Sequence, residues 1–261
     1  GRKSGVALDS QRQVNEKFLI TVDTTSYIRT TVDYQDDWTA PDFQSETSAE
    51  HGSAHAKSFD QAHVIQLIKC GSWVAPADLK ASGAFYDGIT KTMTGYAAAT
   101  DAEVKAAFIV KAHKDVLAEF VKRDLGGSLS EFITLIEPDT FNVLLDHKKL
   151  MNVEFSGDSS NNYVQRRIAW LNGVRVIETP RFPTAAIASH ILGPGFNVSA
   201  AEAKARFIVF HPRKTLVTVE AKPMTVRVWD DEREFNNVLD SYTMYTVGIK
   251  RGDAVAVGFT D

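Results

Sequence analysis

Residues 43–69 read FQSETSAEHGSAHAKSFDQAHVIQLIK, and this stretch predicts one long α-helix. It contains no Pro and a single internal Gly, and it is dense in Ala, Ser, Glu and Gln. Gly71 follows and predicts the C-terminal cap. A helix of roughly 25 residues runs about 37 Å, which is longer than most globular domains need. The length of this helix is therefore the first indication of the fold.

Two β-strands are predicted before the helix. Residues 16–22 read EKFLITV and are rich in apolar and β-branched side chains. Residues 27–34 read YIRTTVDY and place Ile, Thr, Val and Tyr on one face at a period of two. Residues 23–26 have turn chemistry, so we expect the two strands to pair as a long antiparallel hairpin. Residues 1–15 are polar and predict a loop that belongs to this hairpin.

An α/β region is predicted after the long helix and a looser segment at residues 71–99. Thr100 and Glu103 form a capping-box pattern at the start of a second helix, in which apolar residues recur at four-residue spacing. The pair Gly126–Gly127 predicts the end of that helix. Next, residues 132–136 (FITLI) predict a short buried strand, and the Glu-Pro-Asp that follows predicts the first turn of another helix.

The last part of the chain is predicted to be rich in strands. Residues 173–178 (GVRVIE) and 206–210 predict short strands, and residues 215–258 predict a longer β segment. We assign no element to residues 184–204. The sequence has no internal repeat and no low-complexity linker, so we expect an α+β fold whose two subdomains share the first and last parts of the chain.

The composition excludes several classes of protein. The chain has 261 residues, of which 44% are hydrophobic and 24% charged, as in an ordinary globular protein. No apolar run is long enough to span a membrane, and residues 1–5 lack the core of a signal peptide. The 29 Lys and Arg against 33 Asp and Glu give a charge of -4, without the basic excess of a direct nucleic-acid binder. The single cysteine, Cys70, excludes an intramolecular disulfide and a Cys-based zinc site.

The order of these pieces resembles that of the major capsid proteins of tailed bacteriophages, the Hong Kong 97 fold, and looks most similar to T-seven-like podoviruses. In that family a hairpin arm, the E-loop, leads through strands into a long spine helix, as residues 12–34 (RQVNEKFLITVDTTSYIRTTVDY) lead here into residues 43–69. The family then has a helix, a buried strand and a helix that begins at Pro-Asp, as in residues 101–123 and in FITLIEPDTF at 132–141. A Gly-led strand that ends near a Pro follows, as in LNGVRVIETP at 171–180.

The resemblance implies a peripheral domain with the long spine helix and a β-sheet, an axial α/β domain and an extended hairpin loop. Residues 1–15 would be the returning half of the E-loop, residues 16–99 the peripheral strands and spine helix, and residues 100–210 the axial domain. Residues 211–261 would be a returning β segment shared between the two domains. We expect the numbering to begin inside the E-loop, after the N-terminal arm and the outgoing half of that loop.

The resemblance also implies a structural function: self-assembly into the hexamers and pentamers of an icosahedral shell that encloses double-stranded DNA without sequence-specific binding. It implies a scaffolding protein, a portal protein at one vertex, an optional decoration protein, no membrane, and assembly in the cytoplasm of the host bacterium. We expect no catalytic residue, cofactor, metal or isopeptide crosslink. The charged residues that we expect to contact neighbouring subunits are Arg2, Lys3, Arg12, Asp36, Asp37, Asp158, Arg166, Arg167, Asp230, Asp231, Glu232 and Arg233.

The patterns that resemble chemical sites are weak. His51 and His55 have the spacing of two metal ligands on a helix, but no third ligand accompanies them, so we expect a solvated helix face. Residues 193–195 (GPG) lack the Lys-Ser or Lys-Thr of a phosphate-binding loop. The acidic residues 230–234 indicate a solvated turn, or charge pairing with a neighbouring subunit, rather than a cation site. Residues 251–253 (RGD) predict a hairpin turn.

Two other functions stay open on the sequence alone. An encapsulin has the same fold and packages enzymes in place of a genome, so the contents of the particle distinguish it from a capsid protein. An α/β enzyme or ligand-binding domain would form a small uniform oligomer with a pocket, whereas a capsid protein forms large particles or needs a scaffold to do so.

Overall fold

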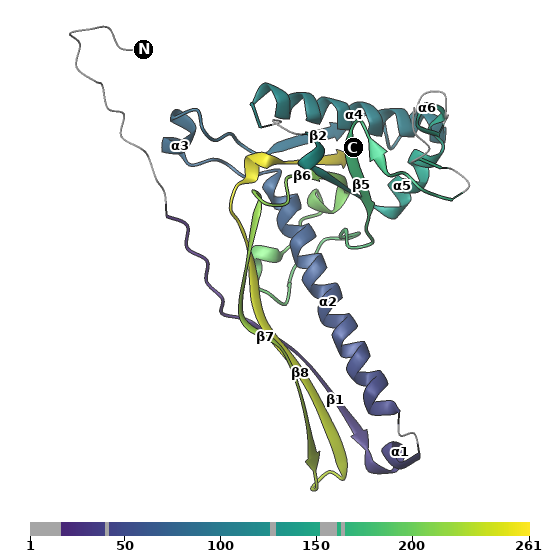
Figure 1. The fold of residues 1–261 in the computed structure, drawn as a ribbon, viewed down its shortest axis with the longest axis vertical. Coiled ribbons are helices and arrows are strands. Elements are labelled where there is room, and N and C mark those ends of the chain that lie inside the picture. The colour runs from purple at the N-terminus through teal and green to yellow at the C-terminus, as the bar shows by residue number, and fades with distance from the viewer. Residues whose placement is uncertain (1–16, 40–41, 126–128, 152–160, 163–164) are drawn as a thin grey trace, which may run out of the picture.

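The computed structural model describes residues 17–39, 42–125, 129–151, 161–162 and 165–261. Figure 1 shows two parts. The first, called the body here, is a six-stranded sheet with its helices, and the second, called the arm, is a three-stranded sheet with one long helix that extends away from the body. The predictions for residues 1–15 and for Gly126 and Gly127 lie outside the described residues.

The arm consists of β1 (Thr25–Asp33), β7 (Leu216–Asp231), β8 (Asn236–Ile249) and the helix α2 (Phe43–Cys70). The strands lie antiparallel in the order β1-β8-β7, and α2 runs along one face of them (Figure 1). Exposed and less exposed residues alternate along β1, because successive side chains of a strand point to opposite faces. A short helix, α1 (Tyr34–Thr39), joins β1 to α2. The prediction of the long helix is confirmed.

The predicted N-terminal hairpin is wrong. Residues 17–22 form no strand, and the residues expected to turn include Thr25 and Ser26, which already belong to β1. The partner of β1 is β8, more than 200 residues later, with Tyr27 opposite Tyr242. The apolar side chains of Phe18 and Ile20 lie against the backbone of Gly248 in β8. An apolar, β-branched sequence favours an extended chain but does not determine which strand it pairs with. In the described structure, residues 17–24 do not pair with any strand.

The sheet of the body has the order β2-β9-β6-β3-β5-β4. Its strands are β2 (Ile89–Met93), β3 (Ile133–Ile136), β4 (Trp170–Leu171), β5 (Val174–Glu178), β6 (Ala205–Phe210) and β9 (Val255–Thr260). The helices of this part are α3 (Ala77–Ala81), α4 (Ala102–Lys122), α5 (Pro138–Leu145) and α6 (Lys148–Met151), with short 3-10 turns at Leu129–Glu131, Pro194–Phe196, Glu202–Lys204 and Gly252–Ala254. The predicted strands at 132–136, 173–178 and 206–210 and the Pro-initiated helix are confirmed, whereas β2 and α3 lie in the segment that the sequence left loose.

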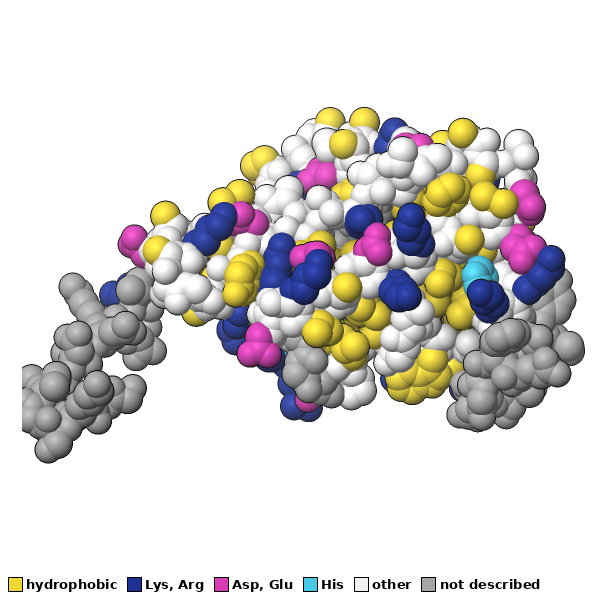
Figure 2. Space-filling view, turned by 90° about the horizontal axis from the view of Figure 1, so that it is seen from above, with side chains coloured by type: hydrophobic (Ala, Val, Ile, Leu, Met, Phe, Trp, Pro, Cys, Tyr) yellow, Lys and Arg dark blue, Asp and Glu magenta, His cyan; other side chains and the backbone are white. Residues whose placement is uncertain are grey.

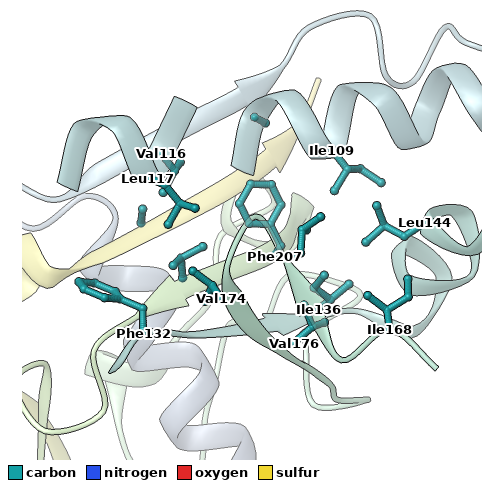
Figure 3. Close-up of a cluster of buried hydrophobic side chains, with 14 of the residues drawn as sticks. Ile109, Val116, Leu117, Phe132, Ile136, Leu144, Ile168, Val174, Val176 and Phe207 are labelled. Atoms are coloured by element: carbon teal, nitrogen blue, oxygen red, sulfur yellow. The ribbon is translucent and has the colours of Figure 1, made fainter. Parts of the chain in front are cut away.

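Both faces of the body sheet carry a buried apolar cluster. One face packs against α4 and α5 in a large apolar cluster, and Phe207 lies in the middle of it (Figure 3). A Cβ at Gly258 would collide with the Phe207 ring, so a glycine is required for the ring to rest on β9. The opposite face packs against the C-terminal half of α2 through Val64, Leu67 and Ile68. The long helix therefore belongs to both parts of the molecule.

Residues 184–204, which the sequence left unassigned, form an irregular segment on the arm helix. Leu192, Phe196 and Val198 are buried against Ala62 and Ile65 of α2, together with side chains of β8. A single antiparallel bridge joins Ile187 to Val198 within the segment. The segment therefore adds a third apolar cluster to the root of the arm.

Two local predictions are corrected by the structure. The helix α4 is capped by Asp101, whose side chain accepts a hydrogen bond from the backbone N–H of Glu103 at 3.0 Å, so the capping residue is not Thr100. The RGD sequence is not a hairpin turn, because β8 and β9, which it connects, belong to different sheets. Asp253 is instead fully buried, paired with Arg251 at 2.7 Å and bonded to the backbone N–H of Tyr86. Within the described residues, no helix is long and apolar enough to cross a membrane.

Candidate assembly surfaces

The predicted contact residues divide into three groups. Arg2, Lys3, Arg12 and Asp158 lie outside the described residues. Arg166 and Arg167 lie in the body, between α6 and β4. The remaining six come from two distant parts of the sequence and meet at the far end of the arm: Asp36, Asp37, Asp230, Asp231, Glu232 and Arg233.

The far end of the arm, called the tip here, is built from α1 and the turn at residues 232–235 between β7 and β8 (Figure 1). The backbone N–H of Tyr34 donates to the carbonyl oxygen of Phe235 at 3.3 Å, and their rings meet edge to face at 4.7 Å. Trp38 stacks on Tyr34 and lies edge to face with Phe235, and Trp38 and Phe235 remain 71% and 54% exposed. Large aromatic side chains that stay exposed in a cluster are typical of a contact surface.

The tip also concentrates negative charge. Asp37 accepts hydrogen bonds from the side-chain amides of Gln44 and Asn237, each at 2.9 Å, which ties α1 to α2 and to β8. The pKa of the Tyr34 phenol is raised by loss of hydration and by the carboxylates of residues 230–232, Asp230 above all. The tip is therefore acidic as well as aromatic, as the sequence suggested for residues 230–234.

The face of the arm sheet that points away from α2 carries a cluster that sequence analysis missed. Arg29 donates two hydrogen bonds to the carboxylate of Asp240, at 2.6 and 2.8 Å. The guanidinium groups of Arg29 and Arg227 both lie over the ring of Trp229, at 5.2 and 5.5 Å from its centroid. The signal in the sequence was Arg227 and Trp229 at a spacing of two within a predicted strand, which places both on one face.

The face that points toward α2 holds a buried polar network, and here the sequence-based prediction was wrong. His51 and His55 are 4% and 6% exposed, not solvated. The Oγ of Ser241 lies 3.1 Å from Nδ1 of His51 and 2.9 Å from Nε2 of His55, and Nε2 of His51 lies 2.8 Å from Oγ1 of Thr30. Burial and the neighbouring His51 lower the pKa of His55. The two histidines thus fasten the helix to the sheet.

In the body, Arg166 is held in place whereas Arg167 borders a groove. Arg166 donates to both carboxylate oxygens of Glu178 at 2.9 Å, and its guanidinium lies 5.2 Å from the centroid of the Phe141 ring. The groove has a volume of about 650 Å³, and its lining includes Arg167, Trp170 and Arg175 on the open side of β4 and β5. Figure 2 shows the face of the body seen from above, where Lys and Arg side chains are interspersed with hydrophobic ones rather than gathered into a single basic field.

Neither a metal-ligand cluster nor a reactive thiol is found among the described residues. Among them, no group of three or more His, Cys, Asp or Glu side chains is placed to hold a metal ion. Burial raises the pKa of the Cys70 thiol to about 12, so this thiol stays protonated and unreactive at neutral pH.

Comparison with solved structures gives a consistent set of relatives. A protein of the bacteriophage PhiM1 mature capsid is 46% identical, with a TM-score of 0.86 over 100% of this chain and 78% of that one. A protein of the capsid of cyanophage P-SCSP1u is 14% identical, with a TM-score of 0.73 over 98% of this chain and 81% of that one. A virus-like particle protein from Pyrococcus furiosus is 14% identical, with a TM-score of 0.50 over 90% and 76%. No protein-family model and no curated protein matches the sequence.

Proposed function

Since the chain belongs to the family of tailed-phage major capsid proteins, we propose that it assembles, as hexamers and pentamers, into an icosahedral shell around double-stranded DNA. The observation that carries this proposal is the likeness to the PhiM1 capsid protein, which extends over the whole chain at 46% identity. The function is structural, and the fold is the α+β Hong Kong 97 type, with a body and a long arm.

The two parts of the molecule suit two roles in a shell. We assign the peripheral role to residues 16–99, the axial role to residues 100–210, and a role shared by both to residues 211–261. Support for the shared role comes from β7 and β8, which lie in the arm, and from β9, which lies in the body; β2, at the end of the first range, also lies in the body. Residues 1–15 would be the returning half of an E-loop. A subunit of this shape reaches several neighbours at once, and a closed shell sums many such contacts.

The charged residues at the ends of the molecule would make contacts between subunits. The tip combines Asp36, Asp37 and the charged residues 230–233 with exposed aromatic rings, and the groove beside Arg167 is also lined by Arg175. The net charge of -4 is consistent with a shell that contains DNA rather than gripping it. A scaffolding protein, a portal protein, an optional decoration protein and assembly in the bacterial cytoplasm complete the proposal.

The alternative of an encapsulin has less support. The virus-like particle protein from Pyrococcus furiosus shares the fold at 14% identity, whereas the PhiM1 capsid protein is 46% identical to this chain. Identity at the lower level indicates a common fold and nothing about the contents of a particle.

The test is electron microscopy of the full-length protein expressed together with the genes that flank its own, with expression of the protein alone as the control. Closed icosahedral shells that contain DNA, or empty procapsids, are the expected result. Shells filled with protein would favour the encapsulin. A small uniform oligomer under both conditions would overturn the proposal, and covalent ladders on denaturing gels of the particles would contradict the absence of a crosslink.

A further inference from the structure

We propose that the outer face of the arm sheet is self-complementary, and that the arms of two copies dock there with the acidic row of one copy on the basic row of the other. The inference rests on the proposed function, because it names the partner of the arm within the shell. It concerns a sheet face that the described part of the molecule leaves without a covering element at these rows.

The pairing of the strands fixes the rows. Residues directly opposite each other in a ladder place their side chains on the same face. Arg29 lies opposite Asp240, which lies opposite Arg227, so these three residues form one row across the sheet. This row is called the basic row here. Nearer the tip, Asp33 and Asp231 both lie opposite Asn236 and form a second row, called the acidic row.

These rows are on the face away from α2. Ser241 and Thr30 contact histidines of α2, so their neighbours Asp240 and Arg29 point to the opposite side, since side chains alternate along a strand. The basic and acidic rows are four residues apart on both outer strands, which corresponds to about 13 Å. The ring of Trp229 lies between them, opposite Val238.

The charges of each row are unbalanced within one copy. In the basic row, the single carboxylate of Asp240 is held by Arg29 through two hydrogen bonds, so two guanidinium groups share one negative charge. Arg227 makes no salt bridge among the described residues, and its guanidinium rests on Trp229. In the acidic row, Asp33 and Asp231 have only an amide side chain between them, and both accept hydrogen bonds from backbone N–H groups next to the turns.

One copy cannot neutralise its own rows, because both lie on the same rigid strands and about 13 Å apart. A second copy turned by a two-fold rotation about an axis near Trp229 brings its acidic row onto the basic row of the first, and its basic row onto the acidic one. This is an isologous contact, in which each pair of opposite charges occurs twice. The charge complementarity of the face with itself is therefore the reason to commit to a second copy as the partner.

Charge reversal tests the contact in the full-length protein expressed with its flanking genes. We expect Arg227→Glu alone, and Asp231→Arg alone, to lower the fraction of protein that sediments as shells at least tenfold, because each places like charges opposite one another. The double variant Arg227→Glu with Asp231→Arg restores opposite charges and should recover at least half of the wild-type yield. Lys222→Glu changes the same charge on the same strand outside both rows and should leave the yield unchanged.

The outcomes separate the inference from the proposed function. If the wild-type protein forms no shells, the proposed function fails. If it forms shells and Arg227→Glu forms them equally well, the docking of the arms is wrong while the function stands. If both single variants fail and the double variant recovers nothing, the two rows meet something other than each other, and the inference is overturned. Thermal unfolding of the unassembled variants checks that each one is folded.

Discussion

The body and the arm differ in how their sheets are enclosed. The body sheet is packed on one face by α4 and α5 and on the other by α2, and the first face holds a large apolar cluster beside one buried polar pair, His113 and Thr134. The arm sheet is covered on one face, partly through the polar network of His51, His55 and Ser241, and its other face carries charges and aromatic rings. A sheet buried on both faces supplies stability, whereas a sheet open on one face supplies a surface. This chain therefore places stability in the body and contact surface in the arm.

The largest effect that this comparison predicts is for a ring in the body. Phe207 is fully buried in the middle of the apolar cluster, so Phe207→Ala should lower the free energy of unfolding by about 3–5 kcal/mol. The matched change at the tip, Phe235→Ala, removes a ring that is 54% exposed and should cost below about 1 kcal/mol. Urea unfolding of the purified chain measures both. Equal losses at the two positions would show that the arm carries as much of the stability as the body.

The next largest effect is a pH dependence that originates in the body. His113 is fully buried, with Nε2 at 2.9 Å from Oγ1 of Thr134 and Nδ1 at 3.1 Å from the amide nitrogen of Asn172. Burial lowers its pKa from 6.5 to about 4. Below pH 6.5 the unfolded chain therefore binds a proton that the folded chain does not, and the contribution of this residue to stability is lost as the pH falls. By pH 4 the loss should reach about 3 kcal/mol.

The variant His113→Gln isolates this effect from the titration of other groups. Burial also lowers the pKa of His55, His147 and His190, and every carboxylate titrates in both proteins, so only the difference between the two unfolding curves is informative. That difference should shrink by about 3 kcal/mol between pH 7 and pH 4. A difference that stays constant over this range would mean that His113 is hydrated or already protonated in the folded body.

The sequence predicted the elements of this fold better than their pairing. The helix at residues 43–69 follows from local composition, and the strands at 132–136 and 206–210 follow from short apolar runs with clear ends. The partner of β1 cannot be predicted from local sequence, because β8 lies more than 200 residues away. A hairpin with the neighbouring apolar segment was the simpler prediction. The cap of α4 shows the same limit locally, since Thr100 and Asp101 are both good capping residues and only the backbone conformation decides between them.

The candidate surfaces were predictable where charge and turn chemistry coincide. The acidic residues 230–233 and the pair Asp36–Asp37 were identified one by one, but their meeting at the tip depends on β1 and β8 lying side by side. The basic row was missed because Arg29, Asp240 and Arg227 come from three strands. His51 and His55 were assigned to solvent because the spacing of residues on a helix says which of them share a face, and not what covers that face.

The smallest effect concerns the polar network of the arm. Ser241→Ala removes the hydroxyl that lies between His51 and His55 and leaves a buried ring nitrogen of each without that partner. We expect a cost of about 1–3 kcal/mol, because a buried polar group that loses its hydrogen bond keeps its full desolvation penalty. Ser26→Ala is the control, since Ser26 lies on β1 and makes no side-chain hydrogen bond that the structure shows. It should cost below about 0.5 kcal/mol.

Where Ser241→Ala destabilises the molecule is more informative than how much stability it costs. If the histidines fasten α2 to the arm sheet, Ser241→Ala should speed hydrogen exchange at the backbone amides of β1 and β8, and leave the amides of β6 at their wild-type rates. Exchange that accelerates equally in β6 would mean that arm and body unfold as one unit. The shared helix α2 would then couple them, and the division between a stabilising body and a surface-bearing arm would describe geometry but not energetics. If exchange is unchanged in the arm strands and in β6, the network of His51, His55 and Ser241 does not stabilise the arm.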